Sequence, residues 1–264
     1  MKTRIISAAI MIVVFASCVL ISPVTRVLFF AVAGGICAYE FSKNVEKLEA
    51  RCTLWVMLLY LVGQAVLALL EVKTFWYITW FVFCLYTALF SGVIHKRVAG
   101  KGALFTMAGM TYPCMLFGLL MYIGVSDIWA QTLIVACLAT WICDTFALTG
   151  GTRFGKHKVA PTVSPNKTVE GCVCGALSSL VTGVIVFYIL KAFSPVPLWL
   201  CVVTSLLAST MGQIGDLSES LLKRMIGVKD FGNLIPGHGG MFDRVDSLLF
   251  SIPTAFFCLI LAGI

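Results

Sequence analysis

Residues 169–190 read VEGCVCGALSSLVTGVIVFYIL, and Glu170 near the start is the only charged side chain in this stretch. An α-helix of about 20 mostly apolar residues is long enough to cross the hydrocarbon core of a bilayer. Apolar runs of this kind recur along the chain, which has a mean hydropathy of +1.00 and only 12% charged residues. Such a composition is typical of membrane proteins with several spans. We therefore predict an all-α polytopic membrane protein.

Hydropathy windows predict about nine transmembrane helices in this chain. Their expected ranges are 5–22, 24–40, 53–71, 75–94, 103–125, 127–149, 169–190, 194–215 and 245–263. The basic start of the first range resembles a signal peptide. However, this range is long enough to span, and another apolar helix follows Pro23. We therefore expect the first helix to remain uncleaved.

The loops between these helices differ strongly in positive charge. With the N-terminus in the cytoplasm, all of the nineteen Lys and Arg residues except Arg26, Lys73 and Lys191 fall on the cytoplasmic side. This is the positive-inside pattern, and an odd number of spans puts the C-terminus on the opposite side. Orientation and anionic headgroups explain the net charge of +7, so we expect no nucleic-acid partner.

A polar segment interrupts the apolar chain from Gly215 to Asp246, where the sequence reads GDLSESLLKRMIGVKDFGNLIPGHGGMFDRVD. Its acids, from a total of twelve in the chain, are Asp216, Glu219, Asp230, Asp243 and Asp246. Ionisable side chains close to lipid are costly and mark functional sites. The predicted topology puts Asp144, Asp216, Asp243 and Asp246 at one depth, the cytoplasmic interface. We therefore predict the functional site on that side of the membrane.

Asp243 and Asp246 are three residues apart at the start of a predicted helix, so they share a helix face. Two carboxylates above lipid are costly unless a cation neutralises them, and Mg²⁺ takes carboxylate and phosphate oxygens as ligands. The alternative is that both acids only favour the dipole at a helix N-terminus. Because Asp144 and Asp216 reach the same depth, we favour a metal site.

The loop 151–168 is a candidate phosphate-binding segment. It carries Arg153, Lys156, Lys158 and Lys167, although a plain positive-inside loop is the alternative. The pattern G-x4-G-K begins at Gly150, but His157 stands where a P-loop needs Ser or Thr. A membrane helix, not a strand, precedes it, so we exclude the P-loop fold.

The glycine-rich segment 227–240 is a second candidate, because glycines let backbone N–H groups approach an anion closely. His238 within it is a candidate proton donor or phosphate contact, although a lone loop histidine is more often structural. If the eighth span continues as an amphipathic helix, Asp216 and Ser220 share a stripe. The alternative for that region is a solvated helix end.

The run S-L-L-K-R-x4-K-D-F-G-N-L-I-P-G-H-G-G-M-F-D-R-V-D, from Ser220 to Asp246, resembles the signature of the phosphatidate cytidylyltransferases (CDP-diacylglycerol synthases). CDTFALTGG at residues 143–151 and FGKHKVAPTVSPNKTVEG at residues 154–171 resemble the same family. Leu148 and Thr162 depart from the pattern, where an aromatic and a basic residue are more usual. The opening KTRIISA is also similar, so the resemblance spans the chain.

This resemblance implies that CTP and phosphatidic acid give CDP-diacylglycerol and pyrophosphate, with Mg²⁺, a second cation such as K⁺, and a homodimer. The implied metal ligands are Asp144, Asp216, Asp243 and Asp246. The implied catalytic residues are Asp216, Lys223, Arg224, Lys229, Asp230, His238, Asp243 and Asp246. The implied substrate contacts are Lys156, Ser164, Lys167, Thr168, Ser220, Gly239, Gly240 and Arg244.

We predict one integral membrane domain over residues 1–264 in a bacterial inner membrane. Residues 1–125 would form a lipid-facing or dimer scaffold, and residues 126–264 the catalytic helices and loops, open to the cytoplasm. A CTP-dependent lipid-alcohol kinase is the nearest alternative. A cation transporter is the other, but its charges belong near the bilayer midplane, often in inverted repeats, whereas these acids gather at one face.

Overall fold

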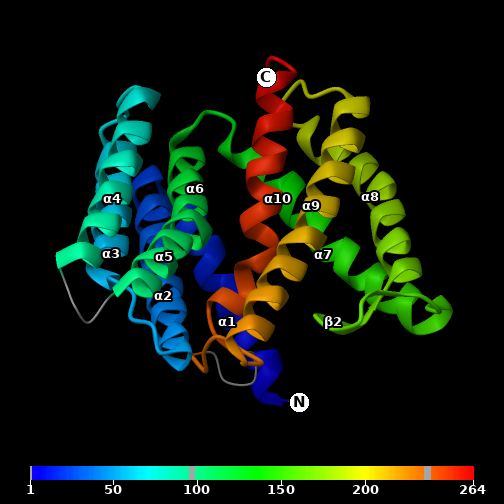
Figure 1. Ribbon diagram of the computed structural model, residues 1–264. Helices are drawn as coiled ribbons and strands as arrows, with labels where there is room; N and C mark the ends of the chain where they lie inside the picture. Colours follow the sequence, from blue (N-terminus) through cyan, green and yellow to red (C-terminus); the bar gives the residue numbers. More distant parts are fainter. Residues whose placement is uncertain (1, 95–98, 235–238) are drawn as a thin grey trace. The chain divides into compact units, whose positions relative to one another are not determined.

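The computed structural model describes residues 2–94, 99–234 and 239–264, and Figure 1 shows that most of this chain is helical. The N-terminal helices are α1 (Lys2–Ile21), α2 (Pro23–Val45), η1 (Glu46–Leu48), α3 (Leu54–Leu69), α4 (Thr74–Ile94), α5 (Ala99–Gly109), η2 (Met110–Cys114) and α6 (Met115–Val125). The later elements are α7 (Trp129–Phe154), β1 (Lys158–Ala160), β2 (Ser164–Thr168), α8 (Val169–Leu190), α9 (Leu198–Ile226) and α10 (Phe242–Leu261). His238 lies outside the described residues, so its role stays a prediction.

The prediction of an all-α membrane protein is confirmed. Among the described residues, seven helical segments are long and apolar enough to cross a membrane. Two of the predicted spans correspond to shorter apolar helices, Ala9–Ile21 and Leu54–Leu69. The second of these, α3, has 16 residues. At about 1.5 Å per residue it is roughly 24 Å long, less than the hydrocarbon core of about 30 Å.

Three helices extend beyond their predicted ends. α2 continues to Val45, α7 to Phe154 and α9 to Ile226, past the predicted ends at residues 40, 149 and 215. Hydropathy falls where polar side chains begin, but a helix continues as long as its backbone bonds do. The extension of α9 puts Asp216, Ser220 and Lys223 on one helix, which is the condition for Asp216 and Ser220 to share a stripe.

The described residues form two compact units. The first unit comprises Met1–Ser126 with Met225–Arg244, and the second comprises Asp127–Arg224 with Val245–Ile264. In the first unit α2 packs against α3 and α6. Its fully buried side chains include Phe41, Met57, Tyr60 and Phe117. This core supports the C-terminal end of α2, where polar side chains begin.

In the second unit α7 and α8 pack closely against each other, and Figure 1 shows that the segment containing β2 joins them. Small residues make this approach possible, as they do between membrane helices in general. A Cβ on Gly171 would lie 2.6 Å from the carbonyl oxygen of Ala147, and one on Gly175 would lie 2.8 Å from the Sγ of Cys143. A larger residue at either position would separate the two helices. We call this contact the glycine seam.

The connection between α7 and α8 folds into a small antiparallel hairpin. β1 pairs with β2, with Lys158 opposite Thr168 and Ala160 opposite Ser164. Thr168 then caps α8, because its hydroxyl accepts a hydrogen bond of 3.2 Å from the backbone N–H of Gly171. The basic loop of the sequence is therefore an ordered hairpin that joins two packed helices.

Candidate active site

An acidic cluster forms in the second unit from Asp216 and Glu219 on α9 and Asp246 on α10. One carboxylate oxygen from each residue lies within 4.8 Å of the others. Asp216 and Glu219 share a face because they are three residues apart on one helix. Glu219 is fully buried, with 0% of its surface exposed. The acidic cluster is thus a set of convergent oxygen donors.

Two lysines neutralise part of this charge. The Nζ of Lys167, on β2, lies 2.5 Å from the Oδ2 of Asp216. Lys223 forms an ion pair with Glu219 one helical turn away on α9. The hairpin and the cap of α8 fix the backbone of Lys167, while helical spacing alone places Lys223. The site therefore combines groups that attract a cation with groups that attract phosphate.

Asp144 on α7 lies at the edge of the acidic cluster. Its carboxylate interacts electrostatically with Asp216, Lys167 and Asp246. Asp144 is itself exposed, and it is not one of the three residues whose oxygens converge. Its role as a metal ligand stays a prediction, and the geometry gives it the weaker position.

The donor set fits a hard divalent cation. All three convergent groups are carboxylates, and Mg²⁺ binds oxygen ligands, commonly one or two carboxylates with phosphate and water completing the shell. Among the described residues, no thiol or imidazole group belongs to the acidic cluster. A softer metal would favour such ligands. The described residues thus supply an acidic site able to hold a metal ion.

The hairpin loop is held by an acid that sequence reasoning missed. The carboxylate of Glu170 accepts hydrogen bonds from the backbone N–H groups of Lys156 and His157, at 3.0 and 3.2 Å. Its Oε1 also lies 2.6 Å from the Nδ1 of His157. Nearby, the Nε of Arg224 donates to the carbonyl oxygen of Val163 at 3.1 Å. Glu170 thus binds the end of the G-x4-G-K sequence to the start of α8. This arrangement is not a P-loop.

The other predicted residues divide between the units. Lys156 is exposed, Ser164 is half-buried and Ser220 is buried, and these three belong to the second unit. The first unit contains the predicted residues Lys229, Asp230, Gly239, Gly240, Asp243 and Arg244. Of these, Lys229, Asp230 and Arg244 are exposed and Asp243 is buried. The catalytic and binding roles predicted for these residues stay predictions.

Asp243 makes specific contacts within the first unit. Its Oδ2 accepts hydrogen bonds of 2.9 Å from the backbone N–H groups of both Phe231 and Gly240. The sequence predicts that N–H groups of segment 227–240 serve an external anion. In the structure, these two N–H groups bind a carboxylate of the protein itself. Asp243 thereby links Phe231 and Gly240 to the start of α10.

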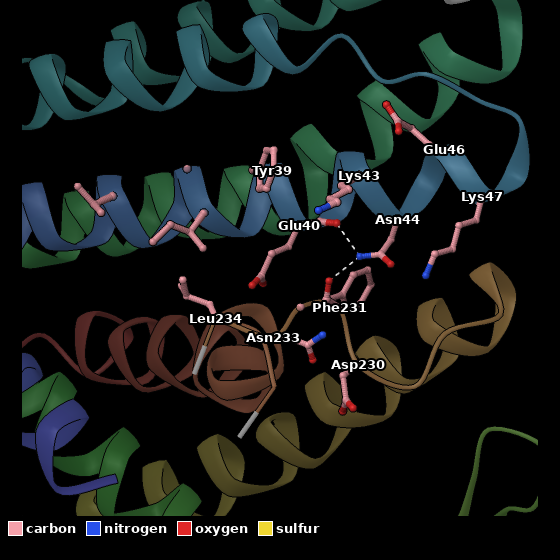
Figure 2. Close-up of a pocket in the computed structure, with 14 residues that line it drawn as sticks. Tyr39, Glu40, Lys43, Asn44, Glu46, Lys47, Asp230, Phe231, Asn233 and Leu234 are labelled. Carbon is pink, nitrogen blue, oxygen red and sulfur yellow. Dashed lines mark hydrogen bonds between the residues drawn. The ribbon is translucent and has the colours of Figure 1, made fainter. Parts of the chain in front are cut away.

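A cavity of about 980 Å³ lies beside this segment in the first unit. Figure 2 shows its polar wall, where Glu40, Lys43 and Asn44 of α2 stand opposite Asp230 and Asn233. Neither Glu40 nor Asn44 was a candidate in the sequence. Both lie at the predicted end of an apolar span, where a lone acid and a lone amide carry no motif.

The chain matches the Cytidylyltransferase family over residues 2–262. It is 31% identical over 261 residues to "Phosphatidate cytidylyltransferase" of Staphylococcus haemolyticus (strain JCSC1435), with 96% of each chain covered. It is 46% identical over 126 residues to "Phosphatidate cytidylyltransferase" of Bacillus subtilis (strain 168), covering 48% of this chain and 46% of that protein. The matched range includes the acidic cluster, both lysines and the glycine-rich segment. The chain belongs to the cytidylyltransferase family.

Proposed function

We propose that this protein transfers CMP from CTP to phosphatidic acid, giving CDP-diacylglycerol and pyrophosphate. The observation that carries the proposal is the acidic cluster with Lys167 and Lys223, built into a membrane chain of the cytidylyltransferase family. A relative aligned over 96% of this chain has the name of that activity. Transport is disfavoured because the cluster lies at the polar extension of α9, beyond its apolar part.

The reaction joins two anions. An oxygen of the phosphatidate monoester attacks the α-phosphorus of CTP and forms a new P–O bond. The bond between the α-phosphorus and its bridging oxygen to the β-phosphate breaks, and pyrophosphate leaves with those electrons. The nucleophile is already largely anionic near neutral pH, so no strong general base is needed. The main barrier is repulsion between like charges.

Lys167 and Lys223 address this repulsion. Both ammonium groups lie at the acidic cluster, and fixed positive charges stabilise the charge that develops on a transferring phosphoryl group. Phosphate oxygens would compete with Asp216 and Glu219 for these two lysines. Arg224 and Lys229 belong to the same proposal, as further contacts for the departing pyrophosphate.

Mg²⁺ is the proposed cofactor, with Asp216, Glu219 and Asp246 as its protein ligands. When bound, it supplies Lewis-acid polarisation of phosphate oxygens and charge neutralisation. Glu219, which the sequence did not predict, joins Asp216 and Asp246 in this set because its carboxylate converges with theirs; Asp144 and Asp243 stay predicted ligands. A second cation such as K⁺ is proposed beside Asp144, whose carboxylate adds a further negative charge at the edge.

The proposed location is a bacterial inner membrane, with the N-terminus and active site in the cytoplasm and the C-terminus outside. The distribution of Lys and Arg between loops supports this orientation. It lets CTP arrive from water and phosphatidic acid from the leaflet. We also propose a homodimer that uses residues 1–125, with residues 126–264 as the main catalytic region.

Product analysis tests this function. Purified protein, given labelled CTP and phosphatidic acid, is expected to form CDP-lipid and pyrophosphate only when Mg²⁺ is present. Asp216→Asn, Glu219→Gln and Asp246→Asn are each expected to lose most of this activity. Asp127→Asn is the matched control, because Asp127 is an exposed acid of the same unit outside the acidic cluster. CDP with a phosphorylated lipid alcohol as products would instead establish the kinase alternative.

A further inference from the structure

Glu40 is a buried acid on α2, with 5% of its surface exposed. A buried carboxylate is costly unless it is hydrogen-bonded. Its two oxygens accept hydrogen bonds of 3.0 Å from the backbone N–H groups of Met241 and Phe242, respectively. The first N–H groups of a helix have no partner within the helix, and α10 begins at Phe242. Glu40 therefore caps α10 from a helix 202 residues away in sequence.

A carboxylate is well suited to this position. The N-terminus of a helix carries partial positive charge, which favours a negative group by about 0.3–1 kcal/mol at exposed sites and more when partly buried. Asp243, one residue into α10, binds the N–H groups of Phe231 and Gly240. Two carboxylates thus take four N–H groups from residues 231–242 of the first unit.

Asn44 binds the same segment at a backbone carbonyl group instead of a backbone N–H group. Its Nδ2 donates to the carbonyl oxygen of Phe231 at 2.5 Å and to the carbonyl oxygen of Glu40 at 2.8 Å. Figure 2 shows both hydrogen bonds, of which the one to Phe231 links α2 to the segment and the one to Glu40 lies within α2. Both backbone groups of Phe231 are therefore bound, and its ring packs 4.7 Å from that of Phe242.

The glycines of this segment are explained by the same contact. A Cβ on Gly240 would lie 2.6 Å from the Oε1 of Glu40, and one on Gly232 would overlap the same oxygen. Any side chain at these positions would displace the Glu40 carboxylate from the amides it binds. Gly232 and Gly240 are thus required by a carboxylate of the protein, independently of any bound phosphate.

We propose that Glu40 and Asn44 are positioning residues for the transfer reaction. They fix Phe231 and the residues from Met241 to Phe242, and with them the first turn of α10, the helix that carries Asp246 four residues later. Neither residue touches the reacting groups in this proposal. They act by holding Lys229, Asp230 and the start of α10 in one arrangement. Only the kinetic test of this proposal rests on the proposed function; the exchange test does not.

The direct test is hydrogen–deuterium exchange on the full-length protein in detergent. Glu40→Gln keeps the shape of the side chain but replaces one acceptor oxygen with an NH₂ group, which repels a backbone N–H. We expect amide exchange at Phe231 and at residues 240–242 to accelerate at least tenfold, with exchange in α3 and α6 unchanged. Asn44→Asp, which removes the donor to Phe231, is expected to act in the same segment. Ser42→Ala is the matched control, since Ser42 is buried on α2 and contacts Cys52.

The kinetic test separates positioning from loss of folded protein. Glu40→Gln is expected to lower kcat about 10–100-fold, the range found when a group that orients a catalytic site is removed, with the unfolding temperature near that of Ser42→Ala. Because Glu40→Gln and Gly232→Ala break the same contact, the double variant should lose little more than either single variant. Additive losses, or a kcat within twofold of wild type with unchanged exchange, would overturn the proposal. If wild type makes no CDP-lipid, the proposed function fails, and the exchange experiment still decides the role of Glu40.

Discussion

The ion pair between Lys223 and Glu219 predicts a stability defect that a metal ion should repair. Glu219 has 0% of its side chain exposed and Lys223 has 12%, so the pair is largely shielded from water. Removing one partner of a buried pair typically costs about 3–5 kcal/mol, because the remaining charge is left in a poorly solvated place. Lys223→Met keeps the apolar stem and removes the charge. We expect it to lower the free energy of unfolding by about that amount.

The double variant Glu219→Gln/Lys223→Met is the matched control. It removes both charges while keeping both volumes, and such replacements are often close to neutral. We therefore expect it to unfold near the wild-type temperature. The single variant, in contrast, leaves a carboxylate that a divalent cation can neutralise. Saturating Mg²⁺ should raise its unfolding temperature more than it raises that of wild type, because ligand binding to the folded state stabilises it.

Thermal unfolding followed with a thiol-reactive dye is a suitable assay. The described cysteines are free, and several are buried, including Cys114, Cys137 and Cys201, so they react when the protein unfolds. Equal unfolding temperatures for wild type, single and double variants would refute the reasoning about burial. A Mg²⁺ shift in Lys223→Met no larger than in wild type would refute the placement of the cation at Glu219.

Other predictions concern the metal, the glycine seam and the hairpin. Asp246→Asn should weaken binding of Mn²⁺, used as a paramagnetic probe, at least tenfold, or about 1.4 kcal/mol. The control Asp127→Asn should bind Mn²⁺ as tightly as wild type does. Electron paramagnetic resonance titration measures both affinities. Chelation by EDTA should abolish CDP-lipid formation and added Mg²⁺ should restore it, and activity that persists in EDTA would contradict the metal site. Gly175→Val should separate α7 from α8 and destabilise the protein by about 1–3 kcal/mol, as overpacking does, while Gly100→Val, where a Cβ meets nothing within 4 Å, should have little effect. Glu170→Gln should loosen the hairpin and raise KM for CTP more than it lowers kcat, because it acts on a loop beside Lys167; an unchanged KM would argue against this.

The membrane architecture could be predicted because lipid imposes a simple rule on composition. Every stretch such as residues 169–190 must be apolar over a fixed length, and this is visible without any partner. The helix ends were harder, because α9 continues into Asp216, Ser220 and Lys223 after its hydropathy falls. The structure shows that this helix continues to Ile226, and the spacing of Asp216 and Glu219 on it could have identified Glu219 as a neighbour.

The contacts of the glycine-rich segment could not be predicted in this way. Its glycines indicate that something approaches the backbone closely, but the sequence does not say what. Glu40 and Asn44, which make that approach, are separated from the segment by most of the chain and belong to no motif. Glu170 was invisible for the opposite reason, since an acid in the first turn of a helix is ordinary. Long-range partners of backbone groups become known only when the chain is folded.

The glycine seam also controls the distances between charged side chains in the second unit. Because Cys143 touches Gly175 and Ala147 touches Gly171, the axial offset between α7 and α8 is set by backbone contact. A slip of one residue would move Asp144 by about 1.5 Å along its helix, half the length of a typical hydrogen bond. Lys167 lies on β2, directly before α8, so its distance from Asp144 depends on the uncharged contact between α7 and α8. Substitutions that carry no charge can retune the electrostatics of this site.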